Sequence, residues 1–148
     1  MNSSFTLRVY GLLISDDRIL IAREVYNGRP MVKFPGGGLE YGESTVDCIR
    51  REFLEEMDLE VEIVRHYYTT DFFVASAFHE KTQVMSIYYE VSVTDAASVP
   101  VSAERLHDQG THFFEWIPFD ELDPEIFSFP IDRHVAVLLK AEKANRQK

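Results

Sequence analysis

Residues 36–59 read GGGLEYGESTVDCIRREFLEEMDL, a glycine-rich segment that runs into an acidic, amphipathic pattern. Ser44 followed by Asp47 is typical of a helix N-terminus, because the serine hydroxyl can accept a hydrogen bond from a backbone N–H of the first turn. We therefore expect a helix to begin at about Thr45. Its end should fall near Asp58, since aspartate tolerates the left-handed conformation of a helix C-cap.

The expected helix has an apolar side and an acidic side. Its apolar stripe, spaced three or four residues apart and expected to face a core, consists of Val46, Ile49, Phe53 and Met57. Three glutamates share another side: Glu52, Glu55 and Glu56. Like charges at this spacing repel by about 0.2–0.5 kcal/mol per pair. The pattern therefore indicates either a solvated acidic helix or a face that binds a cation.

The segment from Phe34 to Gly38 precedes this helix, and its composition predicts a tight loop. Glycine permits positive φ and a close approach of the backbone to a ligand. Magnesium takes oxygen ligands, including backbone carbonyls and carboxylates, together with substrate phosphates. A glycine loop followed by a carboxylate-bearing helix suits that chemistry.

The glycine, glutamates and arginine of this region follow a definite spacing. The pattern is Gly37, five residues, Glu43, seven residues, Arg51-Glu52-Phe53, one residue, Glu55-Glu56, one residue, Asp58-Leu59. It resembles the signature of the Nudix hydrolase family. Asp58 departs from that signature, which has glycine there, and Phe53 stands where an aliphatic residue is more usual. The resemblance implies an α/β fold, a Nudix-type α/β/α sandwich with a central mixed β-sheet, as a single domain over residues 1–148.

The resemblance also implies a reaction and a cofactor. The reaction is metal-dependent hydrolysis of a pyrophosphate bond, by attack of water at phosphorus, in a nucleoside diphosphate linked to another moiety or in a nucleoside triphosphate. The implied cofactor is Mg²⁺, with Mn²⁺ as a substitute. The implied metal ligands are Glu52, Glu55, Glu56, the Gly36 carbonyl and, from a later loop, Glu104, with Asp108 as the second candidate. The implied catalytic set is Glu52, Glu55, Arg51 and Glu43. Arg51 is expected to pair with Glu43 or with another carboxylate of the same motif, and the general base is left open among Glu52, Glu55 and a downstream loop acid.

Three cations lie shortly before the glycine segment: Arg23, Arg29 and Lys33. We expect them to contact substrate phosphates, for which guanidinium and ammonium groups are suited. The alternative for each is an ordinary surface cation.

Composition limits the classes of partner. The 148 residues carry a formal net charge of −10, which argues against nucleic-acid polymers and anionic membranes, since both favour basic surfaces. A small phosphorylated substrate, such as a nucleotide derivative, stays compatible with this charge. The single cysteine, Cys48, excludes an intramolecular disulfide, and no apolar run reaches the length of a membrane span. We expect a cytoplasmic protein, and homodimer formation is left open.

The rest of the chain predicts alternating strands and helices. Strands are expected at 5–14 and 18–22, as a hairpin turned at 15–17, and at 61–65, 67–78, 84–93 and 111–117, with a turn at 79–82. A polar loop is expected at 95–110, a short helical turn at 120–122, and a C-terminal helix at 131–144 with Val135, Leu138 and Leu139 facing inward.

Two other functions are compatible with the sequence. A Nudix-fold nucleotide sensor that hydrolyses poorly is one, with Asp58 as its sequence signal, and a non-hydrolytic enzyme is the other. Magnesium-dependent turnover would separate an enzyme from a sensor. The markers that distinguish some Nudix subfamilies are absent from residues 73–76, so the sequence does not select one substrate.

Overall fold

The computed structural model describes residues 2–101, 105–107 and 110–146, which form two compact units. One unit comprises Met1–Leu13 and Pro35–Ala96, and the other comprises Ile14–Phe34 and Ala97–Lys148. The first strand, β1 (Ser4–Ser15), gives most of its length to the first unit and its last residues to the second. The prediction of a single domain over the whole chain stays a prediction.

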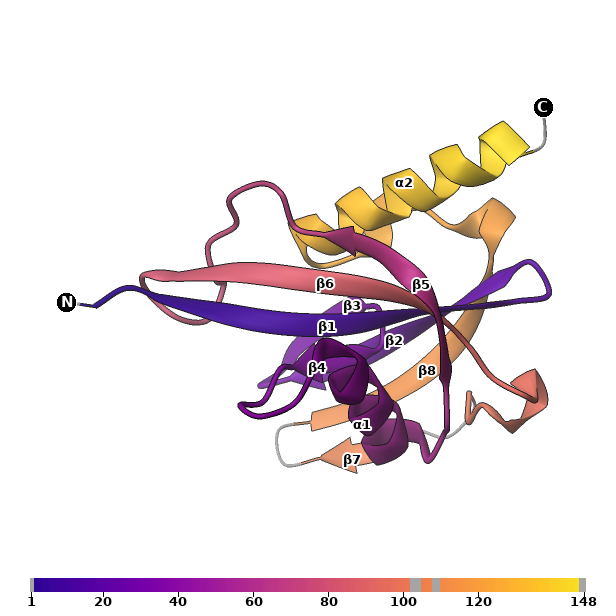
Figure 1. Cartoon of the computed structure of the whole chain (residues 1–148), viewed down its shortest axis with the longest axis horizontal. Helices are drawn as coiled ribbons and strands as arrows, with labels where there is room; N and C mark the ends of the chain where they lie inside the picture. Colours follow the sequence, from indigo (N-terminus) through magenta and orange to yellow (C-terminus); the bar gives the residue numbers. More distant parts are fainter. Residues whose placement is uncertain (1, 102–104, 108–109, 147–148) are drawn as a thin grey trace. The chain divides into compact units, whose positions relative to one another are not determined.

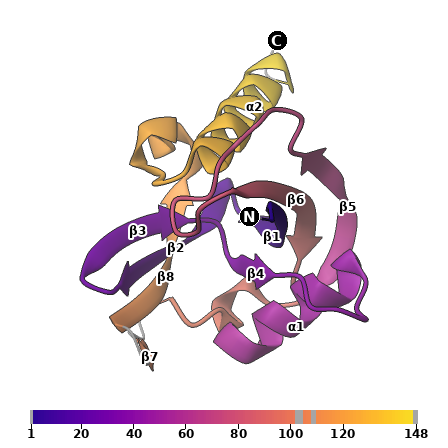
Figure 2. The ribbon, with the colours of Figure 1, turned by 90° about the vertical axis from the view of Figure 1, so that its left-hand side faces the viewer.

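The first unit is a mixed sheet with one helix (Figure 1). Its elements are β1, β4 (Gly36–Gly38), α1 (Thr45–Met57), β5 (Glu62–Thr69) and β6 (Thr82–Ser92). The strand order is β5-β6-β1-β4, in which β6 runs parallel to β1 and the other pairs are antiparallel. Figure 2 shows β4 followed by a loop and then by α1.

Helix α1 is confirmed at the predicted position, with both predicted caps. The Ser44 hydroxyl accepts the Asp47 N–H at 3.0 Å. Asp58 adopts the left-handed conformation at φ 50° and ψ 43°, and its N–H donates to the Leu54 carbonyl at 3.0 Å. The helix therefore begins and ends where serine and aspartate can satisfy backbone groups that have no partner inside it.

The apolar side of α1 packs closely on β1. Its buried residues are Cys48, Ile49, Phe53 and Met57, whereas Val46 is only half-buried. A Cβ added to Gly11 of β1 would lie 2.7 Å from Cε1 of the Phe53 ring. The absence of a side chain at Gly11 thus allows the phenyl ring to rest on the strand. Burial of one such ring stabilises the fold by about 1.5–3 kcal/mol.

The predicted loop at the glycine segment was wrong, because Gly36–Gly38 forms β4. In the pairing of β4 with β1, Gly38 lies opposite Arg8, Gly37 opposite Val9, and Gly36 opposite Tyr10. A Cβ on Gly36 would lie 2.1 Å from the Val9 carbonyl oxygen, and the residue has φ +152°. Only glycine fits this ladder position, so the composition that suggested a loop serves a close strand pairing.

The predicted strand at 67–78 ends at Thr69, with one isolated bridge between Ala75 and Gln83 beyond it. Thr70 terminates the ladder, since its buried hydroxyl donates to the Ser86 carbonyl and accepts the Ser86 N–H. The aromatic residues that suggested a longer strand, Phe72, Phe73 and Phe78, are exposed. The predicted turn is present at 80–81, directly before β6.

The second unit is an antiparallel sheet with a C-terminal helix. Its elements are the end of β1, β2 (Arg18–Tyr26), β3 (Arg29–Lys33), β7 (Arg105–His107), β8 (Gly110–Pro118), the 3-10 turns η2 (Phe119–Glu121) and η3 (Pro124–Ile126), and α2 (Pro130–Arg146). A further 3-10 turn, η1 (Ala96–Ser98), lies where the chain passes from one unit to the other. Strand β2 pairs with the end of β1, with β3 and with β8, and β7 pairs with β8.

Two hairpins shape the second unit. The predicted one is confirmed: Ile14 and Ser15 pair with Ile19 and Arg18, and the turn is made by Asp16 and Asp17 at positive φ. The other, between β2 and β3, was missed. Asn27 (φ 51°) and Gly28 (φ 78°) make its turn, visible in Figure 2, and Asn-Gly is a strong hairpin signal that the sequence reasoning passed over.

The C-terminal helix is confirmed as α2. Val135 and Leu139 are buried as predicted, whereas Leu138 is half-buried. Strand β7 lies within the stretch that was predicted to be a loop, and the helical turn predicted at 120–122 is η2. No helix within the described residues is long and apolar enough to cross a membrane.

Candidate functional site

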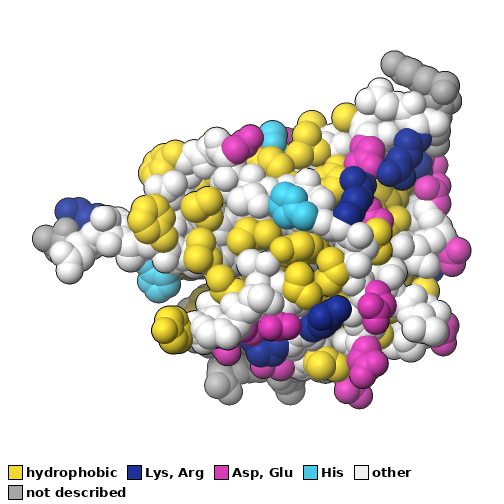
Figure 3. All heavy atoms as spheres, in the orientation of Figure 1, with side chains coloured by type: hydrophobic (Ala, Val, Ile, Leu, Met, Phe, Trp, Pro, Cys, Tyr) yellow, Lys and Arg dark blue, Asp and Glu magenta, His cyan; other side chains and the backbone are white. Residues whose placement is uncertain are grey.

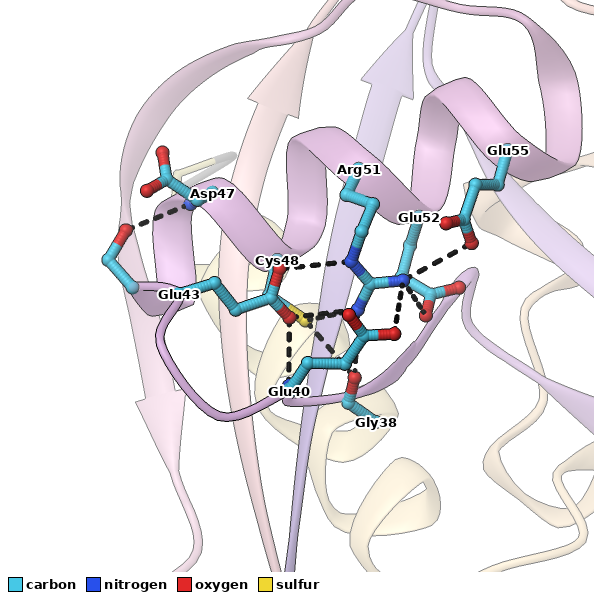
Figure 4. Close-up of polar contacts among 9 residues, drawn as sticks. Gly38, Glu40, Glu43, Asp47, Cys48, Arg51, Glu52 and Glu55 are labelled. Atoms are coloured by element: carbon cyan, nitrogen blue, oxygen red, sulfur yellow. Dashed lines mark hydrogen bonds and ion pairs between the residues drawn. The ribbon is translucent and has the colours of Figure 1, made fainter.

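The Arg51 guanidinium is the centre of the polar cluster beside α1 (Figure 4). Its Nε and Nη2 donate to the two carboxylate oxygens of Glu43 at 2.9 and 2.8 Å. The predicted pairing of Arg51 with Glu43 is therefore present, and it has the two-pronged form that makes such pairs strong and directional.

The same guanidinium also holds two glutamates of the acidic helix face. Nη1 donates to a carboxylate oxygen of Glu52 at 3.1 Å and to one of Glu55 at 3.2 Å. Nη2 also donates to the Gly38 carbonyl at 3.0 Å, and Nη1 lies 3.6 Å from a carboxylate oxygen of Glu40. Glu43, and after it Glu52 and Glu55, raise the pKa of Arg51, so its charge is fixed. One half-buried cation thus collects carboxylates that would otherwise repel one another. Over α1, Figure 3 shows acidic and basic side chains interspersed.

Glu52 lies against the glycine strand. A Cβ on Gly37 would be 2.4 Å from its Oε1, so the carboxylate occupies the space that any other residue at position 37 would fill. The Glu52 side chain is only 12% exposed, whereas that of Glu55 is 58% exposed. The φ of Gly37 lies outside the positive range that favours glycine, so the backbone conformation does not require glycine there. The position of the Glu52 carboxylate is what requires it.

Two pKa shifts result from this packing. The pKa of Glu43 is lowered to about 2, first by the hydrogen bond from Arg51 and then by the backbone N–H of Glu40. Burial, followed by the neighbouring Glu43, raises the pKa of the Cys48 thiol to about 12. Cys48 is fully buried and donates weakly to the Gly38 carbonyl at 3.5 Å, which identifies it as a packing residue.

The donors near α1 fit Mg²⁺ in kind, because they are carboxylate and carbonyl oxygens. Glu52 and Glu55 converge on one nitrogen of Arg51, so their carboxylates already face a common point that carries positive charge. Glu56 follows on the same helix and is half-buried. Among the described residues, no three acidic, histidine or cysteine side chains are gathered closely enough to hold a metal ion as they stand. The predicted ligands Glu104 and Asp108 lie outside those residues.

The three predicted phosphate-binding cations all belong to the second unit. Arg23 forms an ion pair with Glu115 at 2.6 Å, and Lys33 lies 3.4 Å from Glu24 with both side chains largely buried. Arg29 is exposed at the start of β3. Their contacts with substrate stay predictions.

Arg8 was missed by the sequence reasoning. It stands opposite Gly38 in the pairing of β1 with β4, and its Nη1 lies 3.9 Å from the place where a Gly38 Cβ would be. The available signal was a charged residue within the otherwise apolar run from Phe5 to Ile14.

Comparison with known proteins bears on the fold of this chain. Residues 5–138 match the model of the NUDIX domain family. A similar solved structure is a NUDIX hydrolase from Nitrosomonas europaea, with 20% identity, coverage of 97% of this chain and 90% of that chain, and a TM-score of 0.68. Another is a MutT protein from Methanosarcina mazei Go1, with 17% identity, coverage of 97% and 98%, and a TM-score of 0.70. A UDP-X diphosphatase matches with 16% identity, coverage of 100% and 66%, and a TM-score of 0.65. These likenesses show the fold: α/β, with a mixed multi-stranded sheet and two helices, as predicted.

Proposed function

The chain belongs to the Nudix family of hydrolases, and we propose that it cleaves a pyrophosphate bond in a nucleoside diphosphate linked to another moiety, or in a nucleoside triphosphate. The proposed cofactor is Mg²⁺, for which Mn²⁺ can substitute, because the available ligands are hard oxygens. That one of the similar structures is a UDP-X diphosphatase is in keeping with this substrate class.

The observation that carries the proposal is the convergence of Glu52 and Glu55 on one nitrogen of Arg51, beside a strand of three glycines. The ion pair of Arg51 with Glu55, whose side chain is 58% exposed, contributes only about 0–1 kcal/mol to stability, so stability alone does not account for Glu55 beside Glu52. The strand of glycines lets the Glu52 carboxylate lie directly against the backbone at Gly37, where any side chain would displace it.

Each acidic residue has a proposed task. Glu52, Glu55 and Glu56 hold the metal, which when bound neutralises phosphate oxygens and makes water a better nucleophile. The Gly36 carbonyl and Glu104 are proposed to complete the ligand set. Arg51 and Glu43 orient the cluster, because their paired hydrogen bonds fix the guanidinium beside Glu52. The general base is one of Glu52, Glu55 or a downstream loop acid.

The sequence argument for the sensor alternative was the aspartate at position 58. It rested on Asp58 in place of the family's glycine, yet Asp58 adopts the left-handed cap and makes the backbone hydrogen bond that ends α1. The helix that carries the glutamates is therefore terminated normally, and no other observation in the described residues favours a sensor.

A substrate screen tests the proposal. Nucleoside diphosphate derivatives and triphosphates are incubated with Mg²⁺, and both products are identified by mass spectrometry. We expect two phosphorylated products that form with Mg²⁺ and not with excess chelator. Glu52→Gln should remove most of the turnover and leave a measurable remainder, whereas Glu60→Gln, which changes an exposed acid just beyond α1, should leave it intact. Binding without turnover by the unmodified protein would favour a sensor, and chelator-resistant turnover would contradict the metal-dependent reaction.

A further inference from the structure

The three glycines of β4 face alternate sides of the strand. A Cβ on Gly37 would point at the carboxylate of Glu52, as described above. On Gly36, a Cβ would meet Cδ1 of Tyr10 at 2.8 Å, and on Gly38 it would lie 3.9 Å from Nη1 of Arg8. Because side chains alternate along a strand, Arg8 lies on the side of β4 opposite the acidic helix.

Neither backbone geometry nor space requires glycine at position 38. Its φ lies outside the positive range that favours glycine, and 3.9 Å is an ordinary van der Waals distance. Among the described residues, Arg8 Nη1 is the one atom that a Cβ there would meet within 4 Å. A larger residue would thus cover the Arg8 guanidinium, whereas glycine leaves it accessible from β4.

The Arg8 guanidinium is held in place by the side chain of Tyr10. Its Nε donates to the Tyr10 hydroxyl at 2.6 Å, and its central carbon lies 5.6 Å from the centre of the Tyr10 ring. Tyr10 is 5% exposed, and its ring packs on that of the fully buried Tyr88 at 5.3 Å. A guanidinium fixed in this way loses less conformational freedom when it binds a ligand.

We propose that Arg8 binds a phosphate oxygen of the substrate at β4, opposite the carboxylates of α1. This inference rests on the proposed hydrolysis of a pyrophosphate bond. A diphosphate carries negative charge on both phosphates, and a half-buried guanidinium is screened less by solvent than an exposed one. Arginine also suits the role because its planar donors match the geometry of phosphate oxygens. Arg8 therefore supplies positive charge on the side of β4 that the acidic helix does not reach.

Two substitutions of Arg8 and a matched control test this contact by kinetics. Arg8→Gln removes the charge and Arg8→Lys retains it. Arg65→Gln removes a comparable cation of the same unit, which lies on the ring of Tyr67 and pairs with Glu90. For a substrate found in the screen, we expect Arg8→Gln to raise KM about 10-fold or more with little change in kcat, because a charge-assisted hydrogen bond is lost. Arg8→Lys should fall between Arg8→Gln and the parent, and Arg65→Gln should match the parent.

A binding measurement separates this inference from the proposed reaction. Calorimetric titration with methylenediphosphonate, which cannot be hydrolysed at its P–C–P linkage, is carried out in Mg²⁺. We expect binding by the parent and about 10-fold weaker binding by Arg8→Gln. Gly38→Val, which covers the guanidinium while keeping Arg8, should weaken binding in the same direction if Arg8→Gln proves poorly folded.

The outcomes are distinct. Unchanged KM and unchanged diphosphonate affinity in folded Arg8→Gln would overturn the Arg8 assignment while leaving the hydrolase intact. A parent that turns over no nucleotide, but binds diphosphonate through Arg8, would overturn the reaction and support the contact. A parent that does not bind diphosphonate would overturn the Arg8 assignment.

Discussion

Replacing Gly37 by alanine should remove most activity while the protein stays folded. The new Cβ would lie 2.4 Å from Oε1 of Glu52, and ordinary contact begins at 3.4 Å, so the carboxylate must move by about 1 Å. Misplacing a catalytic group by that distance costs on the order of 10²-fold in rate, or about 2.7 kcal/mol of transition-state stabilisation.

The stability of Gly37→Ala should change little. The displaced group is the end of a flexible side chain, and alanine restricts the unfolded chain, which contributes about 0.4–1 kcal/mol in the opposite direction. We therefore expect the free energy of unfolding to stay within about 1 kcal/mol of the parent's. Gly36→Ala provides the contrast, because its Cβ would meet the Val9 carbonyl oxygen at 2.1 Å and the residue has φ +152°. That variant should lose stability as well as activity.

A double-mutant cycle gives the decisive assay. The value of kcat/KM is measured with Mg²⁺ for the parent, Gly37→Ala, Glu52→Gln and the double variant, with urea unfolding of each. If alanine acts by moving Glu52, it should have almost no further effect once Glu52 is glutamine. Losses that multiply across the cycle, or near-parental activity of Gly37→Ala, would refute the reasoning.

Three further predictions concern the surroundings of the site. Asp58→Gly should keep or raise stability, by up to about 1 kcal/mol, because glycine adopts φ 50° without a Cβ penalty; a clear loss in urea unfolding would reveal a side-chain contact of Asp58. The pKa of Glu43 is lowered from 4.5 to about 2, so the stability that ionised Glu43 contributes is present above pH 4.5 and lost as the pH falls toward 2. The free energy of unfolding is measured for the parent and for Glu43→Gln between roughly pH 6 and pH 2, the window that this linkage sets. The parent should be the more stable of the two at the upper end, and the difference in stability should disappear toward the lower end; a constant difference would contradict the prediction. Cys48, buried and with its pKa raised to about 12, should react with a thiol reagent at neutral pH only after unfolding; rapid labelling of the folded protein would be inconsistent with the packing of α1.

Local sequence signals predicted the acidic helix accurately. The Ser44 side chain favours the start of a helix, and the conformational preference of Asp58 favours its end. The bounds of α1 therefore required no knowledge of distant contacts. The pairing of Arg51 with Glu43 was likewise expected from the resemblance, and it is present.

Features that depend on long-range contacts were predicted poorly. The glycines at 36–38 were predicted to form a loop because their strand pairing depends on β1, which is distant in the sequence. The packing of Phe53 on Gly11 of β1 is likewise a contact between distant residues. The position of Arg8 opposite Gly38 depends on the register between two separated strands, which the sequence does not reveal. The hairpin at Asn27 and Gly28 is different, since its signal is local and was overlooked.

Glu56→Gln, measured for turnover and for thermal unfolding with and without Mg²⁺, tests metal binding by the α1 glutamates most directly. The neutral amide binds a hard cation weakly, so the variant should lose most activity and most of the stabilisation that Mg²⁺ gives the parent. Without metal it should be as stable as the parent or about 0.2–0.5 kcal/mol more stable, because repulsion on the acidic face is relieved. Glu60→Gln should behave as the parent throughout. Equal stabilisation of Glu56→Gln and the parent by Mg²⁺, with unchanged turnover, would remove Glu56 from the site and contradict the proposed metal-binding face.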